Sequence, residues 1–400
     1  MRILIIEPHA SGHHANYLHW LVRATNRRQW SVVIATNAAT LTHPSVTGLS
    51  SEFENVQIHL MSASNSANRV AARSPVLIRK EFAYWRGFRE VVDEVRANMS
   101  IDAVILPYID YCFHAVAILG SPFKELPWCG ISMRLAVPKS DANVKSALPW
   151  KWRLAKRVLR GPNLKALFVI NPSVRDIPTN WCAATLLAKL RYLPDPAEQK
   201  INGSRKESRA ILGLCDGDVA ILVFGLIDER KGIDSLLANL SSQNNLSNYV
   251  VILAGKQSAY MHNQMQTSLC VDLLSRKRLI VLDRFLTDAE QSLVFTASDV
   301  VWVGYRNHFY MSGVLVLAGR AGLPVIGTTE GEIGRLITEH NLGAVARMDR
   351  SAEVTLALRA MLDARRRNQM GRRAELAFAS HTVENFGASV MAAFQSSCNA

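Results

Sequence analysis

The second half of the sequence contains two runs in which a buried strand leads through a glycine into a helix. In the first run, an apolar strand ends at Phe224, Gly225 lets the chain turn, and Lys231 and Gly232 open a helix. A lysine at this place points over the carboxyl edge of a parallel sheet, where phosphate groups bind. We therefore interpret Lys231 as a phosphate ligand; a solvated lysine at a helix start is the plain alternative.

In the second run, a strand leads through a loop to Ser312 and Gly313, which open a helix of small and apolar residues. Free backbone amides at a helix N-terminus, with glycine allowing close approach, form an anion site. A capping role alone would explain Ser312. It would not explain why a loop of Tyr, Arg, His and Asn precedes it, so the run indicates a second phosphate contact.

The sequence lacks the short motifs of several large enzyme classes. It contains no GxxxxGK[ST] loop, no GxGxxG after the first strand, no GxSxG and no HExxH. Kinases, dehydrogenases, serine hydrolases and metalloproteases are therefore disfavoured. The six cysteines are scattered singly, without a CxxC pair or a zinc-ligand spacing, which indicates a reduced, cytosolic protein.

Length and composition predict two globular domains. The 400 residues are 49% hydrophobic and 20% charged, and no apolar run reaches the roughly 18 residues of a membrane-spanning helix. The net charge of +13 is divided unevenly, with +11 in residues 1–195 and +2 in residues 196–400. The first half therefore indicates an anionic partner, and nucleic acid, an anionic membrane surface and a phosphorylated substrate all qualify.

Strands alternate with helices in both halves, which predicts parallel sheets covered on both faces. The expected strands are 2–7, 31–36, 56–61, 103–107 and 166–170 in the first half, and 219–224, 249–254, 279–282, 300–303 and 324–327 in the second. The expected helices are 15–27, 75–98, 233–239, 288–297, 313–321, 352–373 and 382–395. Pro194 and Pro196 exclude a helix, and the polar residues after them predict an interdomain linker over 191–208.

Together with LRYLPDP at 190–196 and VVILAGK at 250–256, the two runs resemble the C-terminal half of GT-B glycosyltransferases of the retaining family 4 type. The resemblance covers roughly residues 1–20 and 190–345. It implies an α/β, GT-B fold of two doubly wound Rossmann-like domains facing a central cleft. Residues 1–193 would form an N-terminal acceptor-binding domain, to which a last helix, about 382–400, crosses back, and residues 194–381 a C-terminal nucleotide-sugar-binding domain.

The resemblance also implies roles for particular residues of the second domain. Lys231 looks like the family lysine on the donor diphosphate. The amides of Ser312, Gly313 and Val314 would bind the phosphates of the donor. The loop Asn307–Tyr310, with His308 and Tyr310, would lie along the donor sugar. The family needs no essential metal and no cofactor besides the nucleotide diphosphate-sugar donor.

The sequence departs from the family at three positions of the second domain. Two glutamates eight residues apart, one facing the sugar and one holding the ribose, are replaced by Phe309 and Leu317. The arginine that often follows the first glycine of the lysine motif is replaced by Leu226. Arg230 or Arg306 would supply the missing charge.

Two histidines follow the first strand, at the carboxyl edge of the first sheet. In family terms, the loop of Gly12 faces the donor phosphates, and His13 or His14 would contact a phosphate or the acceptor. A pair of histidines that caps the following helix is the plain alternative.

Asp110 follows the fourth strand, with Tyr108 and His114 beside it. Related enzymes carry an acidic residue or a histidine near the acceptor at this place, so Asp110 is our candidate for orienting the acceptor. A helix cap would explain the residue equally well.

Two basic stretches, 73–92 and 148–162, interleave aromatic and aliphatic residues with Arg and Lys. Helices of this kind lie in a membrane interface and bind anionic lipid. A stacking platform for single-stranded nucleic acid would use similar residues, but no nucleic-acid-binding module accompanies them. An ordinary helix with a core face and a solvated basic face is the plain alternative.

The sequence thus predicts a glycosyltransferase that moves a sugar to a hydroxyl of a glycan or lipid-linked glycan in polysaccharide biosynthesis, with retention and without metal. Asp110, His13 and Lys231 are the candidate catalytic residues. The predicted location is cytoplasmic, with peripheral binding to the inner face of a membrane. A catalytically inactive GT-B binding subunit and a GT-B sugar-nucleotide epimerase are the alternatives.

Overall fold

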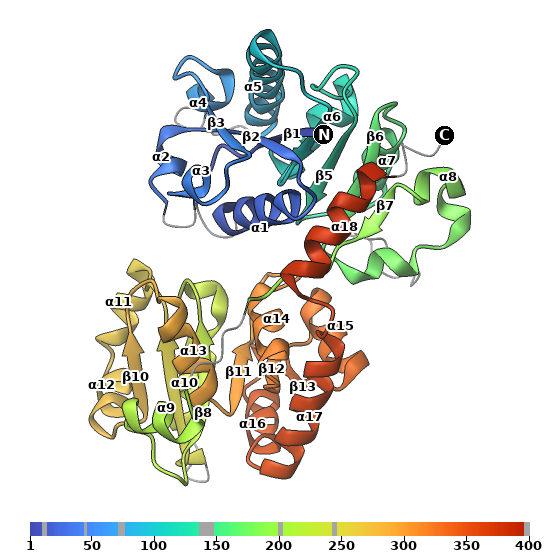
Figure 1. The fold of residues 1–400 in the computed structure, drawn as a ribbon. Coiled ribbons are helices and arrows are strands. Elements are labelled where there is room, and N and C mark those ends of the chain that lie inside the picture. Colours follow the sequence, from blue (N-terminus) through green and yellow to red (C-terminus); the bar gives the residue numbers. More distant parts are fainter. Residues whose placement is uncertain are drawn as a thin grey trace. The chain divides into compact units, whose positions relative to one another are not determined.

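The computed structural model describes residues 1–9, 14–43, 46–70, 77–135, 148–198, 203–241 and 246–395. The chain forms two compact units (Figure 1). The first unit contains residues 1–194 and 383–400, and the second contains residues 195–382. Gly12 and His13, two of the predicted site residues, lie outside the described residues.

The first unit is built on a seven-stranded parallel sheet in the order β3-β2-β1-β4-β5-β6-β7. Its strands are β1 Arg2–Ile6, β2 Ser31–Thr36, β3 Val56–Leu60, β4 Ala103–Leu106, β5 Trp128–Ser132, β6 Leu164–Val169 and β7 Leu190–Tyr192. Its α-helices are α1 His14–Asn26, α2 Ala38–Leu41, α3 Leu49–Glu52, α4 Ser66–Val70, α5 Leu77–Asn98, α6 Phe113–Leu119, α7 Leu148–Leu159, α8 Ala184–Leu187 and α18 Val383–Gln395. Short 3-10 helices are η1 Ile109–Tyr111, η2 Pro172–Asp176 and η3 Thr179–Trp181.

The second unit is built on a six-stranded parallel sheet in the order β10-β9-β8-β11-β12-β13. Its strands are β8 Val219–Phe224, β9 Tyr249–Ala254, β10 Leu279–Leu282, β11 Val300–Val303, β12 Val325–Thr328 and β13 Gly343–Ala346. Its helices are α9 Arg205–Ile211, η4 Glu229–Lys231, α10 Ile233–Ser241, α11 Ala259–Met265, α12 Ser268–Ser275, α13 Asp288–Ala297, α14 Gly313–Arg320, α15 Gly331–His340, α16 Ser351–Ala360 and α17 Ala364–Ala377.

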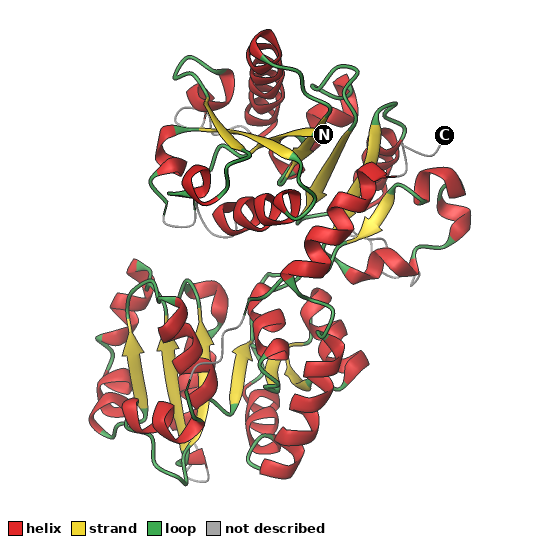
Figure 2. Ribbon diagram, in the orientation of Figure 1, coloured by secondary structure: helices red, strands yellow, loops and turns green. Residues whose placement is uncertain are grey.

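The central strands of both sheets are apolar on both faces, because helices cover both sides of each sheet (Figure 2). The doubly wound α/β architecture predicted from the sequence is therefore confirmed for each unit. Within the described ranges, none of the helices is long and apolar enough to cross a bilayer. The five cysteines that lie in those ranges are all free thiols.

Three strands were missed at the sequence level: β5, β7 and β13. β5 contains a glycine, β7 has only three residues, and β13 has the composition Gly-Ala-Val-Ala. Short or small-residue strands carry a weak local signal because their pairing partners, more than their own side chains, hold them extended.

Two other predictions were wrong in detail. The expected linker over 191–208 contains the end of β7 and the start of α9, whose Ser204 and Glu207 form a capping box. The single helix expected over 352–373 is two helices, α16 and α17. Asp363 caps the second of them by accepting hydrogen bonds from the amides of Arg365 and Arg366.

The described parts of the two basic stretches, residues 77–92 and 148–162, lie mainly in α5 and α7 of the first unit, and residues 73–76 lie outside the described residues. Their apolar side chains, Phe88, Val91 and Val95 on α5 and Trp152 and Val158 on α7, are 8% exposed or less and belong to the core of this unit. Basic side chains of both helices face solvent. This is the arrangement that the plain alternative predicted, with a core face and a solvated basic face.

The last helix, α18, belongs to the first unit, where it packs against α1 (Figure 1). Phe386 is fully buried, and its ring centre lies 5.0 Å from that of Tyr17. A Cβ atom at Gly387 would lie 2.5 Å from the Cβ of Ala24, so the two helices are in backbone-close contact. The end of the chain thus completes a core that its first residues begin.

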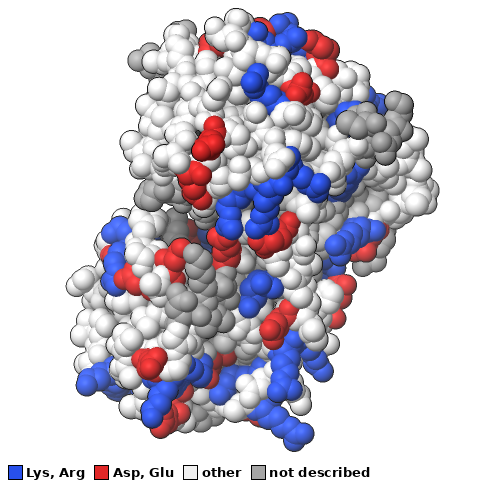
Figure 3. All heavy atoms as spheres, in the orientation of Figure 1, with Lys and Arg blue, Asp and Glu red and all other residues white. Residues whose placement is uncertain are grey.

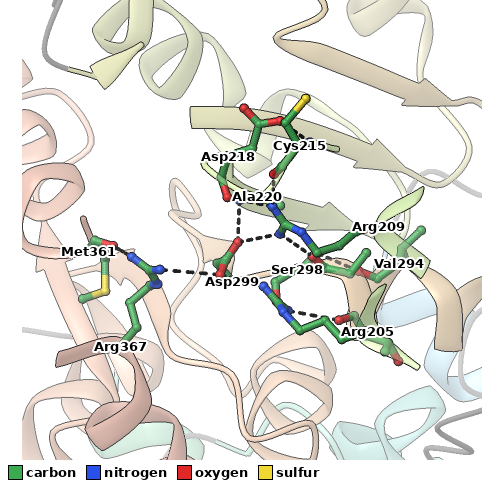
Figure 4. Close-up of polar contacts among 12 residues, drawn as sticks. Arg205, Arg209, Cys215, Asp218, Ala220, Val294, Ser298, Asp299, Met361 and Arg367 are labelled. Atoms are coloured by element: carbon green, nitrogen blue, oxygen red, sulfur yellow. Dashed lines mark hydrogen bonds and ion pairs between the residues drawn. The ribbon is translucent and has the colours of Figure 1, made fainter. Parts of the chain in front are cut away.

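One buried carboxylate ties together the amino-end side of the second unit (Figure 4). Asp299, directly before β11, accepts hydrogen bonds from the amide of Ala220 at 2.8 Å, from Arg205 at 2.8 Å and from Arg209 at 3.1 Å. The guanidinium of Arg367 on α17 lies 3.6 Å away. The side chain of Asp299 is only 12% exposed, so these contacts are shielded from water. Elsewhere on this unit, acidic and basic side chains are interspersed on the face drawn in Figure 3.

We expect Asp299→Ala to lower the free energy of unfolding by about 3–5 kcal/mol, because removing one partner leaves buried guanidinium groups uncompensated. Urea unfolding of the full chain, followed by circular dichroism, measures the change. Asp216→Ala is the matched control, since Asp216 is exposed, and should shift stability by about 0.5 kcal/mol or less. Equal effects of the two substitutions would contradict the role given to Asp299.

Candidate functional site

Glycines open the carboxyl edge of the second sheet. Gly225 after β8 and Gly255 after β9 both have a positive φ, +91° and +143°. A Cβ atom at Gly255 would lie 1.9 Å from the carbonyl oxygen of Gly225, so only glycine fits there. Gly232, at the end of η4, has φ +62°, and a Cβ atom on it would lie 2.5 Å from the carbonyl oxygen of Gly304 after β11. The backbone turns tightly at this edge, and the glycines themselves add no side chains there.

Lys231 is the central residue of this edge. Its side chain is 2% exposed. Its ammonium group donates to the carbonyl oxygen of Phe224 and, at 3.3 Å, to the hydroxyl of Tyr305. Among the described residues no carboxylate forms an ion pair with it. A buried cation without a counter-ion is unfavourable in the free protein, so the arrangement favours binding of an anion next to Lys231.

Tyr305 connects Lys231 with the other predicted ligands. It is 3% exposed, and its ring centre lies 4.9 Å from the Lys231 ammonium and 5.2 Å from the Arg230 guanidinium. The hydroxyl of Ser312 lies 3.4 Å from the hydroxyl of Tyr305. Sequence reasoning did not single out Tyr305. Tyr305 directly follows Gly304, the glycine after β11, and this position was the sequence signal that could have identified it as a site residue.

Ser312 caps α14, and its hydroxyl accepts a hydrogen bond from the amide of Leu315 at 3.4 Å. The amides of Ser312, Gly313 and Val314 donate to no residue in the described part of the chain. These are the amides that the resemblance assigned to a phosphate cradle, and their donors are available for a ligand.

Arg230 and His308 lie beside this group. The His308 ring donates from Nε2 to the carbonyl oxygen of Met311 at 3.2 Å, so its Nδ1 accepts, and Arg230 lies 3.3 Å from Nδ1. Burial lowers the pKa of His308, and the charges of Arg230 and Lys231 add to this effect. The ring of Tyr310 lies 6.2 Å from that of His308. The structure thus brings Lys231 and Arg230 together with Ser312 and with the loop Asn307–Tyr310, which the resemblance places along the donor sugar.

Arg306 is engaged elsewhere. Its guanidinium pairs with Asp234 at 2.9 Å and lines an open hollow of about 630 Å³ along α10, α11 and α12, which the ammonium of Lys231 does not line. Phe309, at the position of one family glutamate, is 58% exposed. Arg230, and not Arg306, is therefore the arginine that lies next to Lys231.

In the first unit, Asp110 lies on η1 after β4, and both of its carboxylate oxygens accept hydrogen bonds. The donors are the hydroxyl of Ser132 at 2.8 Å and the amide of Met133 at 2.7 Å. Burial raises the pKa of Asp110, and the hydrogen bonds from Met133 and Ser132 oppose this effect. The carboxylate therefore holds the turn after β5 and does not cap a helix, because Tyr108 and Cys112 occupy the cap positions; its acceptor role stays a prediction. His114 pairs with the buried Glu81 at 2.6 Å.

A cluster that sequence reasoning missed surrounds Glu7, at the carboxyl end of β1. Glu7 is fully buried, and its carboxylate contacts Nδ1 of His14 at 3.0 Å, the hydroxyl of Tyr111 at 2.9 Å and the amide of His9 at 3.0 Å. The ring of His9 hydrogen-bonds to the hydroxyl of Tyr84 at 2.7 Å. A charged residue that ends an otherwise apolar buried strand was the sequence signal for it. No group of three or more His, Cys, Asp and Glu side chains is placed to hold a metal ion in the ranges that the structure describes.

We expect Gly232→Ala to lower stability by about 1–3 kcal/mol, because alanine is strained at this φ. The added Cβ atom would also displace the backbone next to Lys231. Gly217→Ala is the control, since a Cβ atom there meets nothing within 4 Å. Urea unfolding of both variants measures the difference, and a Gly232→Ala protein as stable as Gly217→Ala would contradict the close approach described here.

The lowered pKa of His308 predicts a stability loss in acid. The folded state favours the neutral ring, so its contribution is complete above the ordinary pKa of about 6.5 and is lost as the pH falls through the lowered value. Urea unfolding between pH 7.5 and 5 should show a smaller loss for His308→Gln than for the wild type. His340→Gln, at a ring that is 45% exposed, is the control. Identical slopes for wild type and His308→Gln would refute the prediction.

Comparison of the sequence with protein-family models and with curated proteins finds no match. Solved structures are similar to this chain over nearly its whole length. A sucrose-phosphate synthase from Thermosynechococcus elongatus is 15% identical, with a TM-score of 0.70, over 99% of this chain and 98% of that one. HepE of Anabaena in complex with UDP is 14% identical, with a TM-score of 0.67, over 99% and 100%. WaaG, a glycosyltransferase involved in lipopolysaccharide biosynthesis, is 15% identical, with a TM-score of 0.62, over 98% of both chains. The chain therefore has the GT-B fold, as its sequence resemblance predicted.

Proposed function

We propose that this protein is a glycosyltransferase that moves a sugar from a nucleotide diphosphate-sugar to a hydroxyl group. The single observation that carries the proposal is the buried ammonium of Lys231, which has no carboxylate partner in the described ranges and lies beside the unpaired amides of α14. A diphosphate supplies the negative charge that this arrangement lacks. The second unit is then the donor-binding unit.

In this reaction, the bond between the sugar and the diphosphate breaks, and negative charge grows on the leaving phosphate. Lys231, Arg230 and the amides of Ser312, Gly313 and Val314 would stabilise that charge. Fixed donors aimed at developing charge are usually the largest single contribution to catalysis. The proposal requires no metal ion and no cofactor, because these groups carry the positive charge that the leaving group needs.

The solved structures support the choice of donor. HepE of Anabaena, which shares the fold, has been solved in complex with UDP and with UDP-glucose. We therefore propose a uridine diphosphate sugar as the first donor to test. Retention of the anomeric configuration, the course typical of the family 4 type, is part of the proposal on the sequence resemblance alone.

The first unit would bind the acceptor, a glycan or lipid-linked glycan of polysaccharide biosynthesis. Solvent-facing basic side chains on α5 and α7 would bring the first unit to an anionic membrane surface on the cytoplasmic side. Most apolar residues of both helices belong to the core, which favours electrostatic attraction over insertion as the form of this contact.

Thermal shift with UDP, GDP and their sugars, without added metal, tests donor binding. A ligand at about 100 times its dissociation constant adds roughly 2.7 kcal/mol of stability. We expect a rise in melting temperature with one nucleotide, lost in Lys231→Ala and kept in Lys206→Ala, which removes an exposed lysine of α9. If no nucleotide shifts the wild type, the donor site is absent and an inactive GT-B binding subunit is the better description.

Turnover separates an enzyme from a protein that only binds the donor. Lys231→Ala should reduce release of nucleoside diphosphate in the presence of acceptor by about two orders of magnitude. Donor binding without any turnover would match the loss of both family glutamates at Phe309 and Leu317. Conversion of the sugar without an acceptor would favour the epimerase instead.

A further inference from the structure

The Glu7 cluster of the first unit has one buried end and one accessible end. Glu7 is fully buried, whereas the side chain of His14, the first residue of α1, is 18% exposed. A fully buried carboxylate needs donors to offset its desolvation, and the cluster provides three: the Tyr111 hydroxyl, the His9 amide and Nδ1 of His14. The carboxylate therefore fixes the orientation of a ring that reaches the surface.

The hydrogen bonds also determine which nitrogen of His14 carries the proton. The Tyr111 hydroxyl donates to Glu7, so its oxygen can accept from Nδ1 of His14, which lies 3.0 Å from both the Tyr111 and the Glu7 oxygens. Two acceptors at Nδ1 place the proton on that nitrogen. Nε2 of the neutral ring then carries the lone pair, and its only neighbour among the described polar groups is the Tyr111 hydroxyl at 3.5 Å. A fixed hydrogen-bond acceptor thus lies at the carboxyl edge of the first sheet, where ligands of such sheets bind.

Aromatic rings surround this acceptor atom. The ring centre of Tyr108 lies 4.6 Å from that of His14. The ring of Tyr111 stacks on that of His14, with an angle of 17° between the two ring planes. The ring of Tyr84 stacks in turn on that of Tyr111, with 4.9 Å between the ring centres. Burial raises the pKa of all three tyrosines, and the charge of Glu7 raises it further, so they stay neutral hydroxyl groups. The cluster offers apolar ring surface, neutral hydroxyls and one fixed acceptor within a few ångströms.

The charges of the cluster disfavour an anion. Glu7 lies beside Nδ1 of the same His14 ring, and Asp110 lies close enough to Tyr108 to raise the pKa of that tyrosine. The exposed Arg134 hydrogen-bonds to Tyr108 and is the cation beside that tyrosine. A phosphate or carboxylate ligand would meet the field of the buried Glu7 carboxylate, whereas a sugar hydroxyl would donate to Nε2 of His14.

We infer that the group Glu7, His14 and Tyr111 binds a hydroxyl of an uncharged sugar, with Nε2 of His14 as the accepting atom and Glu7 and Tyr111 as positioning residues. This inference rests on the proposed function, for which it names the acceptor class: a neutral glycan hydroxyl and not a sugar phosphate. The aromatic rings of the cluster pack against the C–H groups of the same sugar.

Saturation-transfer difference NMR on the full chain tests the inference without knowledge of the natural acceptor. The probes are the methyl glycosides of glucose, galactose, mannose and N-acetylglucosamine, with glucose 6-phosphate and mannose 6-phosphate as competitors. We expect at least one glycoside to bind, and His14→Gln to weaken this binding about tenfold, the upper range for one lost hydrogen bond. Tyr111→Phe should weaken it to a smaller extent, because the ring remains and only a positioning contact is lost.

The matched control is His59→Gln, which removes another His–Glu pair of this unit, His59 with Glu94 at 3.1 Å on β3 and α5. It should leave glycoside binding unchanged, because this pair lies outside the Glu7 cluster. Since Glu7→Gln can unfold a buried site, circular dichroism is recorded for every variant, and the partly exposed His14→Gln carries the decision.

The inference would be overturned by equal glycoside binding by His14→Gln and the wild type, or by stronger binding of the sugar phosphates than of the uncharged glycosides. Absence of glycoside binding by the wild type would also overturn it. The thermal shift with nucleotides is independent of these outcomes. A nucleotide shift without glycoside binding rejects the acceptor class and keeps the proposed function, whereas glycoside binding without a nucleotide shift rejects the proposed function alone.

Discussion

The buried ammonium of Lys231, which forms no ion pair with any described residue, is the central constraint at the carboxyl edge of the second sheet. Burial of a cation opposes folding unless nearby groups offset it. Here a carbonyl oxygen at the end of β8 and the ring and hydroxyl of Tyr305 do so in part. The left-handed Gly225 and Gly232 permit the turn that carries the lysine inward. This burial opposes folding of the free protein, and under the proposed function an anionic ligand would relieve it, a common relation between stability and function.

The local charges of the two units run against their totals. The first half of the chain carries most of the positive charge, yet the carboxyl edge of its sheet presents the buried carboxylate of Glu7 and a ring of tyrosines. The second half is nearly neutral, yet its sheet edge gathers Lys231 and Arg230. Net charge therefore describes the solvent-facing helices, where long-range attraction acts. The chemistry of each site depends on a few desolvated groups that contribute little to the total.

The sequence predicted most of the second sheet because its strands are continuous aliphatic runs, four of which begin and end at the expected residues. Lys231 and Ser312 were found for a similar reason: each lies in the loop between a buried strand and the helix that follows it, so local spacing reveals it. Tyr305 and Glu7 were not found, because their importance arises from packing. The partners of Glu7 lie 2, 7 and 104 residues away in the chain, and no local sequence pattern predicts that these side chains contact one another. The short strands β7 and β13 were missed because neighbouring strands hold them in place.

The position of α18 has a consequence for synthesis of the protein. Phe386 covers Tyr17 and Trp20 of α1, but roughly 190 residues of the second unit separate the two parts of the first in the chain. At a translation rate of about 5–20 residues per second, this interval lasts roughly 10–40 s. The part of the first unit that is made before the second unit is therefore completed only when α18 emerges, and until then Tyr17 and Trp20 lack their contact with Phe386.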